Sequence, residues 1–278
     1  MTTVPKPLRV PFDDLAPGVR PLRGALARYI RRVHRLSAGD RLSLFDPAAS
    51  TEADAQLVDG PGPDLWCRVE TPRPSGYRAL PIRLIQGLGK ADKPDEVIRA
   101  ATALGAARVS LVHTERSVAR PSGERAAARL ERWRRIAVEA ARQSGRGDIP
   151  ALDGPAPLIE VLSAASEPLR IALAAGAPDG SAATEARAGS ELEAVPLFQR
   201  LGAWRAGADV ALLVGPEGGF DDGERLLAAR AGFLPASLGA TTLRSELAGV
   251  AALGALVALS AAGDPLLRAG AATRAERE

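Results

Sequence analysis

The sequence predicts an α/β protein in which a small, mostly β module precedes a larger domain built around a parallel sheet. Two observations predict this class. Short alternating apolar runs fill the first part of the chain, whereas apolar strands alternate with helical stretches in the second part. Between the two parts, Pro72–Gly76 contains two prolines and a glycine and predicts a linker. We therefore expect a first domain over residues 1–75, a second over residues 76–265, and a disordered tail over residues 266–278.

The N-terminal module is predicted to combine one helix with short strands. An arginine-rich stretch predicts a helix over about Leu22–His34, and Ser37–Asp40 supplies the turn that comes after it. Alternating apolar and polar residues then predict three strands separated by Pro, Gly and Asp: Arg41–Phe45, Ala55–Val58 and Leu65–Val69.

The second domain alternates strands and helices, which is the pattern of a sheet with parallel pairing. Its predicted strands are Leu80–Gln86, Val109–His113, Leu169–Ala175, Ala211–Val214 and Ala236–Leu238. Its predicted helices are Asp95–Leu104, Glu124–Gln143, Asp222–Ala231 and Ser245–Ala262. The segment Gly176–Gly189 is rich in Ala, Gly and Pro and predicts a flexible loop.

Composition excludes several classes of protein. The 278 residues are 46% apolar and 25% charged, as in ordinary globular chains. A single cysteine, Cys67, allows no disulfide within the chain, and with only two histidines it leaves no structural zinc cluster. The N-terminus has no apolar run that would mark a secretory signal. We therefore expect a cytoplasmic protein without a metal.

One uncharged stretch could be taken for a membrane segment. It lies between Glu246 and Asp264, and its 17 residues are rich in Ala and Gly. That length is at the lower limit for a spanning helix, and Ala and Gly make the stretch only weakly hydrophobic. A buried helix is the better interpretation, and we expect no membrane partner.

Basic residues are concentrated in two stretches, although the formal net charge is only +3. Arg20–Arg35 contains six arginines and no acidic residue, and Arg116–Arg146 contains nine arginines against three glutamates. Stripes of this kind suit binding to phosphates. A general preference for arginine is the alternative, since only three of the 36 basic residues are lysines. Charge alone therefore leaves RNA binding open.

The strongest motif is Leu213–Phe220, which follows an apolar strand and precedes a predicted helix. It places three glycines, a proline and a carboxylate within the five residues Gly215–Gly219. Ligands of open α/β sheets bind beyond the carboxyl ends of the strands, and glycines let the main chain approach a ligand closely. The alternative is a tight strand-to-helix connection. The density of these residues favours a ligand-binding loop with Glu217 as an acceptor.

A second motif, Ser237–Gly239 followed by Leu243–Glu246, leads into the last predicted helix. Ser245 would suit the N-cap and Glu246 the first turn of that helix, so capping explains both residues. Capping does not explain Arg244, whose charge opposes the helix dipole. An arginine at this position is better explained if it faces an anion or a developing negative charge.

Two further motifs are less specific. Gln86–Lys93 follows a strand but is not a P-loop, because Ala91 stands where Ser or Thr is required. Lys90 and Lys93 could bind RNA phosphates or could lie at solvent-facing turns. The basic helix that ends in Gln143–Arg146 could equally be a solvated surface closed by a glycine.

Taken in order, these motifs resemble the RsmE family of SPOUT methyltransferases over roughly residues 8–260. The matching segments are Gly215–Gly219, Ser237–Gly239, Leu243–Glu246 and the helix from Trp133 to Gln143–Arg146. In the N-terminal module, Val33, Arg35, Gly39-Asp40 and Leu44–Asp46 are similar to the PUA-like RNA-binding domain of the family.

The resemblance implies a C-terminal SPOUT domain with a deep trefoil knot, a homodimer formed through that domain, and an N-terminal PUA-like β-barrel. It also implies the cofactor S-adenosyl-L-methionine, bound in a bent shape by the loops of the knot. Carried onto this chain, the cofactor-binding residues are Leu173, Val214, Gly215, Glu217, Gly218, Gly219, Leu238, Gly239 and Leu243.

The resemblance further implies methylation of N3 of a uridine in small-subunit (16S) ribosomal RNA, either as RNA or in the small ribosomal subunit. We expect Arg244 to stabilise negative charge on the uracil and Glu246 to act as the base, with Glu217 as the other candidate. Two basic surfaces are expected to bind the RNA through its phosphates. Their residues are Arg28, Arg31, Arg32 and Arg35 in the first domain and Lys90, Arg116 and Arg146 in the second.

Two other functions remain open from the sequence. Leu247, Ala100 and Arg142 depart from the family pattern, and such departures would suit a catalytically silent RNA-binding or ribosome-assembly factor on the same fold. A nucleotide-dependent enzyme unrelated to RNA is the third interpretation. The missing P-loop and dinucleotide motifs count against it.

Overall fold

The computed structural model describes residues 7–62, 64–77, 79–117, 120–174, 194–204 and 207–263. The predicted loop Gly176–Gly189 and the predicted tail 266–278 lie outside these residues. The chain divides into two compact units, one made of residues 1–78 with 138–149 and the other of residues 79–137 with 150–278. The boundary between residues 137 and 138 falls inside a single helix, α3 (Gly123–Ser144). The last residues of that helix therefore belong to the first unit, although they are distant from it in sequence.

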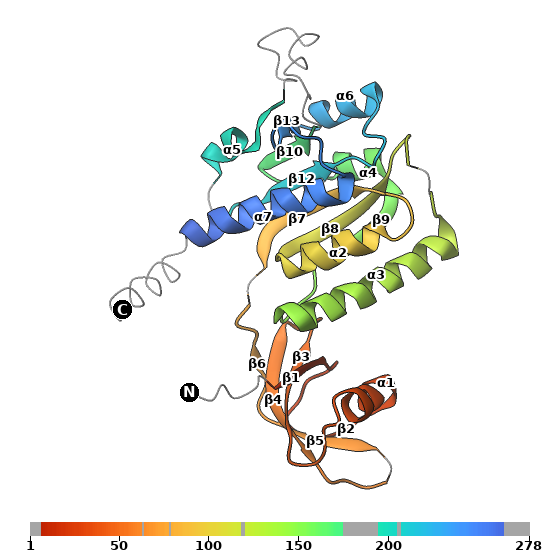
Figure 1. Cartoon of the computed structure of the whole chain (residues 1–278), viewed down its shortest axis with the longest axis vertical. Helices are drawn as coiled ribbons and strands as arrows, with labels where there is room; N and C mark the ends of the chain where they lie inside the picture. Colours follow the sequence, from red (N-terminus) through yellow and green to blue (C-terminus); the bar gives the residue numbers. More distant parts are fainter. Residues whose placement is uncertain are drawn as a thin grey trace. The chain divides into compact units, whose positions relative to one another are not determined.

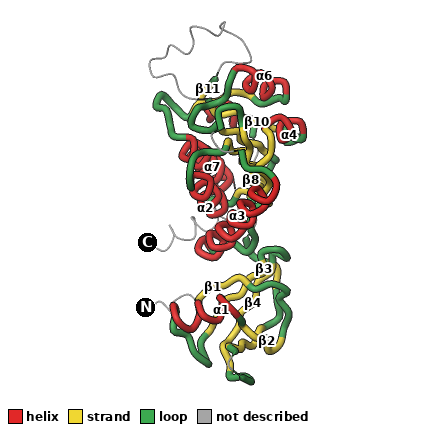
Figure 2. The backbone as a smooth tube through the Cα atoms, turned by 90° about the vertical axis from the view of Figure 1, so that its right-hand side faces the viewer, coloured by secondary structure: helices red, strands yellow, loops and turns green. Residues whose placement is uncertain are grey.

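Besides the end of α3, the first unit consists of a six-stranded sheet and a short helical segment near its N-terminus (Figure 2). Its strands are β1 (Leu8–Pro11), β2 (Gly18–Leu22), β3 (Arg41–Asp46), β4 (Thr51–Val58), β5 (Leu65–Val69) and β6 (Arg73–Pro74). The order is β1-β3-β4-β5-β2 with β6 beside β4, and only the β1–β3 pair is parallel. On β4 the buried residues Ala53, Ala55 and Leu57 alternate with more exposed ones, which is the half-buried pattern that the sequence predicts.

The predicted helix of this unit is shorter than expected and changes its pitch. It runs as α1 (Gly24–Arg28) and continues as a π-helical turn, η1 (Tyr29–Val33). Leu22 does not belong to it, because this residue ends β2 and is fully buried in the core of the sheet. Ile30 anchors the helical segment to the same core.

The second unit is built on a seven-stranded sheet in the order β11-β13-β10-β12-β7-β8-β9, and all its neighbouring pairs are parallel (Figure 1). The strands are β7 (Leu80–Gly87), β8 (Ala106–His113), β9 (Ala151–Pro157), β10 (Leu169–Leu173), β11 (Val195–Pro196), β12 (Val210–Val214) and β13 (Leu234–Ser237). Every residue of the central strand β12 is buried, as expected for a parallel strand covered on both faces. The carboxyl ends of all these strands therefore meet at one edge.

Helices cover both faces of this sheet. They are α2 (Lys93–Ala103), α4 (Leu158–Ser163), α5 (Leu197–Arg200) with the 3-10 turn η3 (Leu201–Ala203), α6 (Asp222–Arg230) and α7 (Ser245–Gly263), together with α3. Gly249 of α7 lies against Leu84, whereas Leu158 of α4 and Ala228 of α6 share a core cluster with Ile85. Successive strand residues point to opposite faces, so α7 and the pair α4–α6 cover opposite faces (Figure 1).

The predicted strands and helices of this unit are present, with ends that either coincide or differ by up to three residues. Strands β9 and β11 were not predicted. Residues 151–157 contain Gly154, Pro155 and Pro157, which argue against a strand, but β9 lies at the edge of the sheet where prolines are tolerated. Within the described residues, no helix is both long enough and apolar enough to span a membrane, and α7 instead packs on β7 and β12.

Candidate functional site

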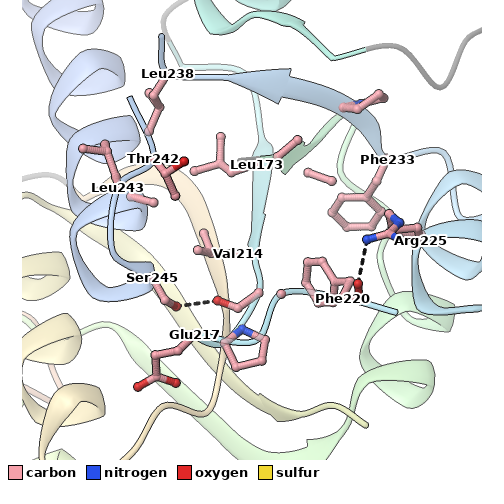
Figure 3. A pocket seen from close by; sticks show the side chains of 18 of the residues that line it. Leu173, Val214, Glu217, Phe220, Arg225, Phe233, Leu238, Thr242, Leu243 and Ser245 are labelled. Carbon is pink, nitrogen blue, oxygen red and sulfur yellow. Dashed lines mark hydrogen bonds between the residues drawn. The ribbon is translucent and has the colours of Figure 1, made fainter. Parts of the chain in front are cut away.

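A cavity of about 840 Å³ opens at the carboxyl edge of the parallel sheet, beyond the neighbouring strands β10, β12 and β13 (Figure 3). Three loops form its walls: the end of β10, the segment after β12, and the segment that leads from β13 into α7. Helix α6 closes one side. This is the position at which open α/β sheets bind their ligands, and the volume falls in the usual range for a small-molecule site.

The segment Gly215–Gly219 after β12 forms a tight turn at the mouth of this cavity. The N–H of Gly219 donates to the carbonyl of Pro216 (2.9 Å), and Gly219 has a φ of 67°, which favours glycine. Strand β7 comes very close to this turn, since a Cβ placed on Gly87 would lie 2.5 Å from the nitrogen of Pro216. Position 87 must therefore be a glycine, because the ends of the neighbouring strands β7 and β12 come too close there for a side chain.

Ser245 connects the start of α7 to the same turn. Its Oγ donates to the carbonyl of Gly215 and accepts a hydrogen bond from Nε2 of Gln86 at 2.8 Å (Figure 3 draws the first of these). The carbonyl of Arg244 accepts the N–H groups of Leu247 and Ala248, so Arg244 occupies the N-cap and Ser245 the first helical position. The prediction that Ser245 caps the helix is therefore wrong, because its hydroxyl bonds to a neighbouring strand end instead.

A lysine between two carboxylates lies beside the glycine turn. Lys93 Nζ is 3.0 Å from Oε1 of Glu217 and 3.2 Å from Oε2 of Glu246. Its hydrogen bond to Glu217, with Glu246 adding to the effect, raises the pKa of Lys93. Burial acts to raise the pKa of Glu217, but the N–H of Lys90 and the ammonium of Lys93 outweigh it, and this pKa lies below its ordinary value. Glu217 is consequently ionised at neutral pH.

The structure brings most of the predicted cofactor and catalytic residues to one cavity. The residues that line it are Leu173, Val214, Gly215, Glu217, Gly219, Leu238, Leu243 and Arg244. Three others do not line it: Gly218 faces Arg116, Gly239 lies in the segment after β13, and Glu246 faces Lys93 in a small neighbouring niche. Of the two glutamates considered as the base, Glu217 is thus the one at the cavity wall.

Several lining residues were missed by the sequence analysis. Phe220 and Phe233 are almost completely buried and give this part of the cavity an aromatic wall (Figure 3). Arg225 lies beside them, and its Nη1 donates to the carbonyl of Phe220 at 2.7 Å. Phe220 could have been found, because it directly follows the glycine turn. Phe233 and Arg225 carry no local signal, since their place depends on how α6 packs.

The residues predicted to bind RNA differ in their exposure. Arg28, Arg31, Arg32 and Arg35 are exposed in the first unit, and Arg31 donates to the carbonyl of Asp64 at 3.3 Å. In the second unit, Lys90 and Arg116 are exposed next to the glycine turn.

Arg146 requires a correction. Its side chain is 1% exposed, its Nε lies 2.6 Å from Oδ1 of Asp148, and its guanidinium faces the ring of Tyr77. Its main-chain carbonyl accepts a hydrogen bond from Arg9 at 3.0 Å. The prediction that Arg146 grips RNA is wrong for this structure, because a guanidinium buried in the first unit has no surface for a phosphate.

Among the described residues, no group of three or more His, Cys, Asp or Glu side chains is placed so that it could hold a metal ion.

Comparisons with known proteins give one consistent family. A family model for the RNA methyltransferase domain matches residues 77–257. A ribosomal RNA small subunit methyltransferase E from Synechocystis sp. is 33% identical over 238 residues, which cover 86% of this chain and 72% of that protein. The protein of the same name from Mycobacterium tuberculosis is 33% identical over 222 residues, covering 75% and 79%.

Two solved structures are similar over almost their full length. A methyltransferase from Legionella pneumophila with bound SAM has a TM-score of 0.75 and 28% identity, covering 91% of this chain and 98% of the other. A ribosomal RNA small subunit methyltransferase E from Neisseria gonorrhoeae bound to S-adenosyl methionine has a TM-score of 0.74 and 25% identity, with the same coverage.

Proposed function

The chain belongs to the ribosomal RNA small subunit methyltransferase E family, and we propose that it transfers a methyl group from S-adenosylmethionine to N3 of a uridine in small-subunit ribosomal RNA. The observation that carries this proposal is the cavity beyond β10, β12 and β13, which has Arg244 at its wall. The small-subunit RNA is inferred from the relatives, and the choice of N3 is inferred from the family resemblance.

The cavity fits the proposed cofactor in size and in chemistry. Apolar side chains and the two phenylalanines can surround a flat heterocycle, while the main chain at Gly215 and Gly219 offers close polar contacts. The ionised carboxylate of Glu217 can accept hydrogen bonds from hydroxyl or amino groups. When bound, S-adenosylmethionine supplies a methyl group on a positively charged sulfur.

Arg244 and the carboxylates provide the groups that the acceptor base needs. Uridine N3 carries a proton at neutral pH, and its loss spreads negative charge onto the two uracil oxygens. Arg244 is exposed and belongs to the cavity wall, so its guanidinium can stabilise that charge. We assign the removal of the N3 proton to a glutamate. Both carboxylates contact Lys93, and Glu217 is the better placed of the two because it lines the cavity whereas Glu246 does not.

Replacing Arg244 tests this assignment. Arg244→Ala should lower kcat for transfer to small-subunit RNA by about 10²- to 10³-fold, the usual effect of losing one group that stabilises transition-state charge. The dissociation constant for S-adenosylmethionine, measured by calorimetry, should stay the same. Arg230→Ala is the matched control, since Arg230 is exposed on α6 and does not line the cavity. Near-normal turnover of a folded Arg244→Ala protein would refute the assignment.

We propose that the first unit is a PUA-like RNA-binding domain. Four exposed arginines support the proposal because they lie within eight residues and include no acidic neighbour: Arg28, Arg31, Arg32 and Arg35. Replacing them by Ala should weaken RNA binding and reduce the slope of log K against log salt by about one for each phosphate that is no longer neutralised. An unchanged slope would argue against this surface.

We also propose that the second unit is a trefoil-knotted SPOUT domain that dimerises through α7, and that the protein acts in the cytoplasm. The outer side of α7 supports the dimer. Leu247 and Leu259, near the two ends of α7, are 51% and 46% exposed, and the helix carries no charge beyond Glu246. Leu259→Glu should convert a dimer into a monomer in analytical ultracentrifugation, whereas Val33→Glu in the first unit should not.

A further inference from the structure

The turn after β8 lies directly against the glycine turn of the cavity. Nη1 of Arg116 donates to the carbonyl of Gly218 at 2.8 Å. A Cβ placed on Gly218 would lie 3.1 Å from Cβ and 3.4 Å from Cδ of Arg116, so the arginine side chain extends along the main chain at position 218. This contact involves the one glycine of the turn that does not line the cavity.

The same turn is fixed at a second point. The N–H of Glu115 donates to Oε1 of Glu224 at 2.8 Å, and Oε2 of Glu224 accepts the N–H of Asp221 at 3.0 Å in the capping box of α6. Nη2 of Arg120 donates to the carbonyls of Thr114 and Glu115 at 3.1 and 2.8 Å. The backbone of this turn is therefore hydrogen-bonded to the first turn of α6 through Glu224, while the side chain of Arg116 bonds to the glycine turn.

Glycines give the segment Gly215–Gly219 little conformational preference of its own. Its shape has to be imposed by neighbours, and two side chains do so from different sides. Ser245 donates to the carbonyl of Gly215, and Arg116 donates to the carbonyl of Gly218. A turn that is ordered before the ligand arrives loses less entropy on binding.

We propose that Arg116 is a positioning residue that holds the glycine turn in its cofactor-binding shape, rather than a contact to RNA. This inference rests on the proposed function, because it names the ligand as S-adenosylmethionine. It assigns Arg116 to the cofactor site although its side chain touches neither the cavity nor a reacting atom. Nη1 of Arg116 donates the one hydrogen bond to Gly218, so a lysine, whose ammonium is a different shape and more strongly hydrated, should replace it only in part.

The test separates a positioning role from an RNA contact. The variants are Arg116→Met, Arg116→Lys and Gly218→Ala, with Arg125→Met as the control for an exposed arginine on α3. Three quantities are measured on the full chain: the dissociation constant for S-adenosylmethionine without RNA, the amide hydrogen exchange of residues 215–224 without any ligand, and the dissociation constant for small-subunit RNA. Melting temperatures show that each variant folds.

Arg116→Met should weaken cofactor binding by about fivefold or more, as expected for the removal of one hydrogen bond from a charged donor that is partly exposed to solvent. It should also speed amide exchange in residues 215–224. Arg116→Lys should keep part of both properties, Gly218→Ala should behave like Arg116→Met, and Arg125→Met should change neither.

Unchanged cofactor affinity and unchanged exchange in Arg116→Met, together with weaker RNA binding, would overturn the inference and make Arg116 an RNA contact. The two failures are distinguishable. A wild-type protein that binds no S-adenosylmethionine would refute the proposed function, whereas exchange that stays the same in Arg116→Met would refute the positioning role whether or not the cofactor binds.

Discussion

The two halves of the carboxyl edge of the parallel sheet differ in the loops that leave their strands. Beyond β10, β12 and β13 the loops leave a cavity, and residues of these loops, Arg244 among them, line it. At the ends of β7 and β8, polar side chains bond to the residues that form the cavity wall: Gln86 of β7 bonds to Ser245, and Arg116 in the loop after β8 bonds to Gly218. We therefore infer that contacts at the ends of β7 and β8, the packed half, determine the shape of the cavity beyond β10, β12 and β13, the hollow half. Breaking contacts in one half should change binding in the other.

The largest effect is expected at the closest approach of the two halves. In Gly87→Ala, the new Cβ would lie 2.5 Å from the nitrogen of Pro216 and 2.6 Å from its Cδ. Both belong to the backbone or ring of the glycine turn, so the whole turn must shift. We expect the free energy of unfolding to fall by about 1–3 kcal/mol. We also expect the affinity for S-adenosylmethionine, measured by calorimetry, to fall more than about tenfold.

Gly202→Ala is the matched control for this change, because a Cβ there meets no atom within 4 Å. If Gly87→Ala bound the cofactor as tightly as this control, the packed half would not determine the shape of the cavity.

A smaller effect is expected for Ser245→Ala. This change removes the donor to the carbonyl of Gly215 and the acceptor for Nε2 of Gln86, which is almost completely buried. Nε2 of Gln86 keeps its hydrogen bond to the carbonyl of Gly87, so we expect the free energy of unfolding to fall by about 0.5–1.5 kcal/mol, the usual contribution of a hydrogen bond, which chemical denaturation can measure. Ser163→Ala removes a hydroxyl that bonds only within an exposed helix turn and should have little effect. Equal destabilisation by the two serine changes would contradict a special role for Ser245.

The smallest effect is expected in the pH dependence of binding when Lys93 is replaced. The pKa of Glu217 lies below its ordinary value partly because of Lys93, so the carboxylate is protonated only at low pH. In Lys93→Met this pKa should rise, and cofactor affinity should begin to fall at a higher pH than in the wild type. Titrations between about pH 3 and 7 cover both cases.

Lys90→Met is the control for this titration. Lys90 reaches Glu217 through its main-chain N–H, which the substitution keeps. Superimposable pH profiles for the wild type and Lys93→Met would show that the ammonium does not set the charge of Glu217.

The sequence predicted the parts of this arrangement that have a local signal. The three glycines after an apolar strand predicted a loop of special shape, which lies at the cavity, and Arg244 stood out because its charge opposes the dipole of the next helix. The aromatic wall had no such signal, since Phe233 reaches the cavity only through the packing of α6. At Arg146 the sequence was misleading. A basic residue is expected to be exposed, but contacts with Asp148 and Tyr77, which the sequence does not reveal, bury this one.

Methyl transfer to uridine by this protein should depend on Arg244. The most direct test incubates the protein with labelled S-adenosylmethionine and small ribosomal subunits that lack the modification, digests the RNA to nucleosides and identifies them by mass spectrometry. We predict labelled 3-methyluridine with the wild-type protein and its disappearance with Arg244→Ala. Label on a different nucleoside, or equal 3-methyluridine from both proteins, would contradict the account.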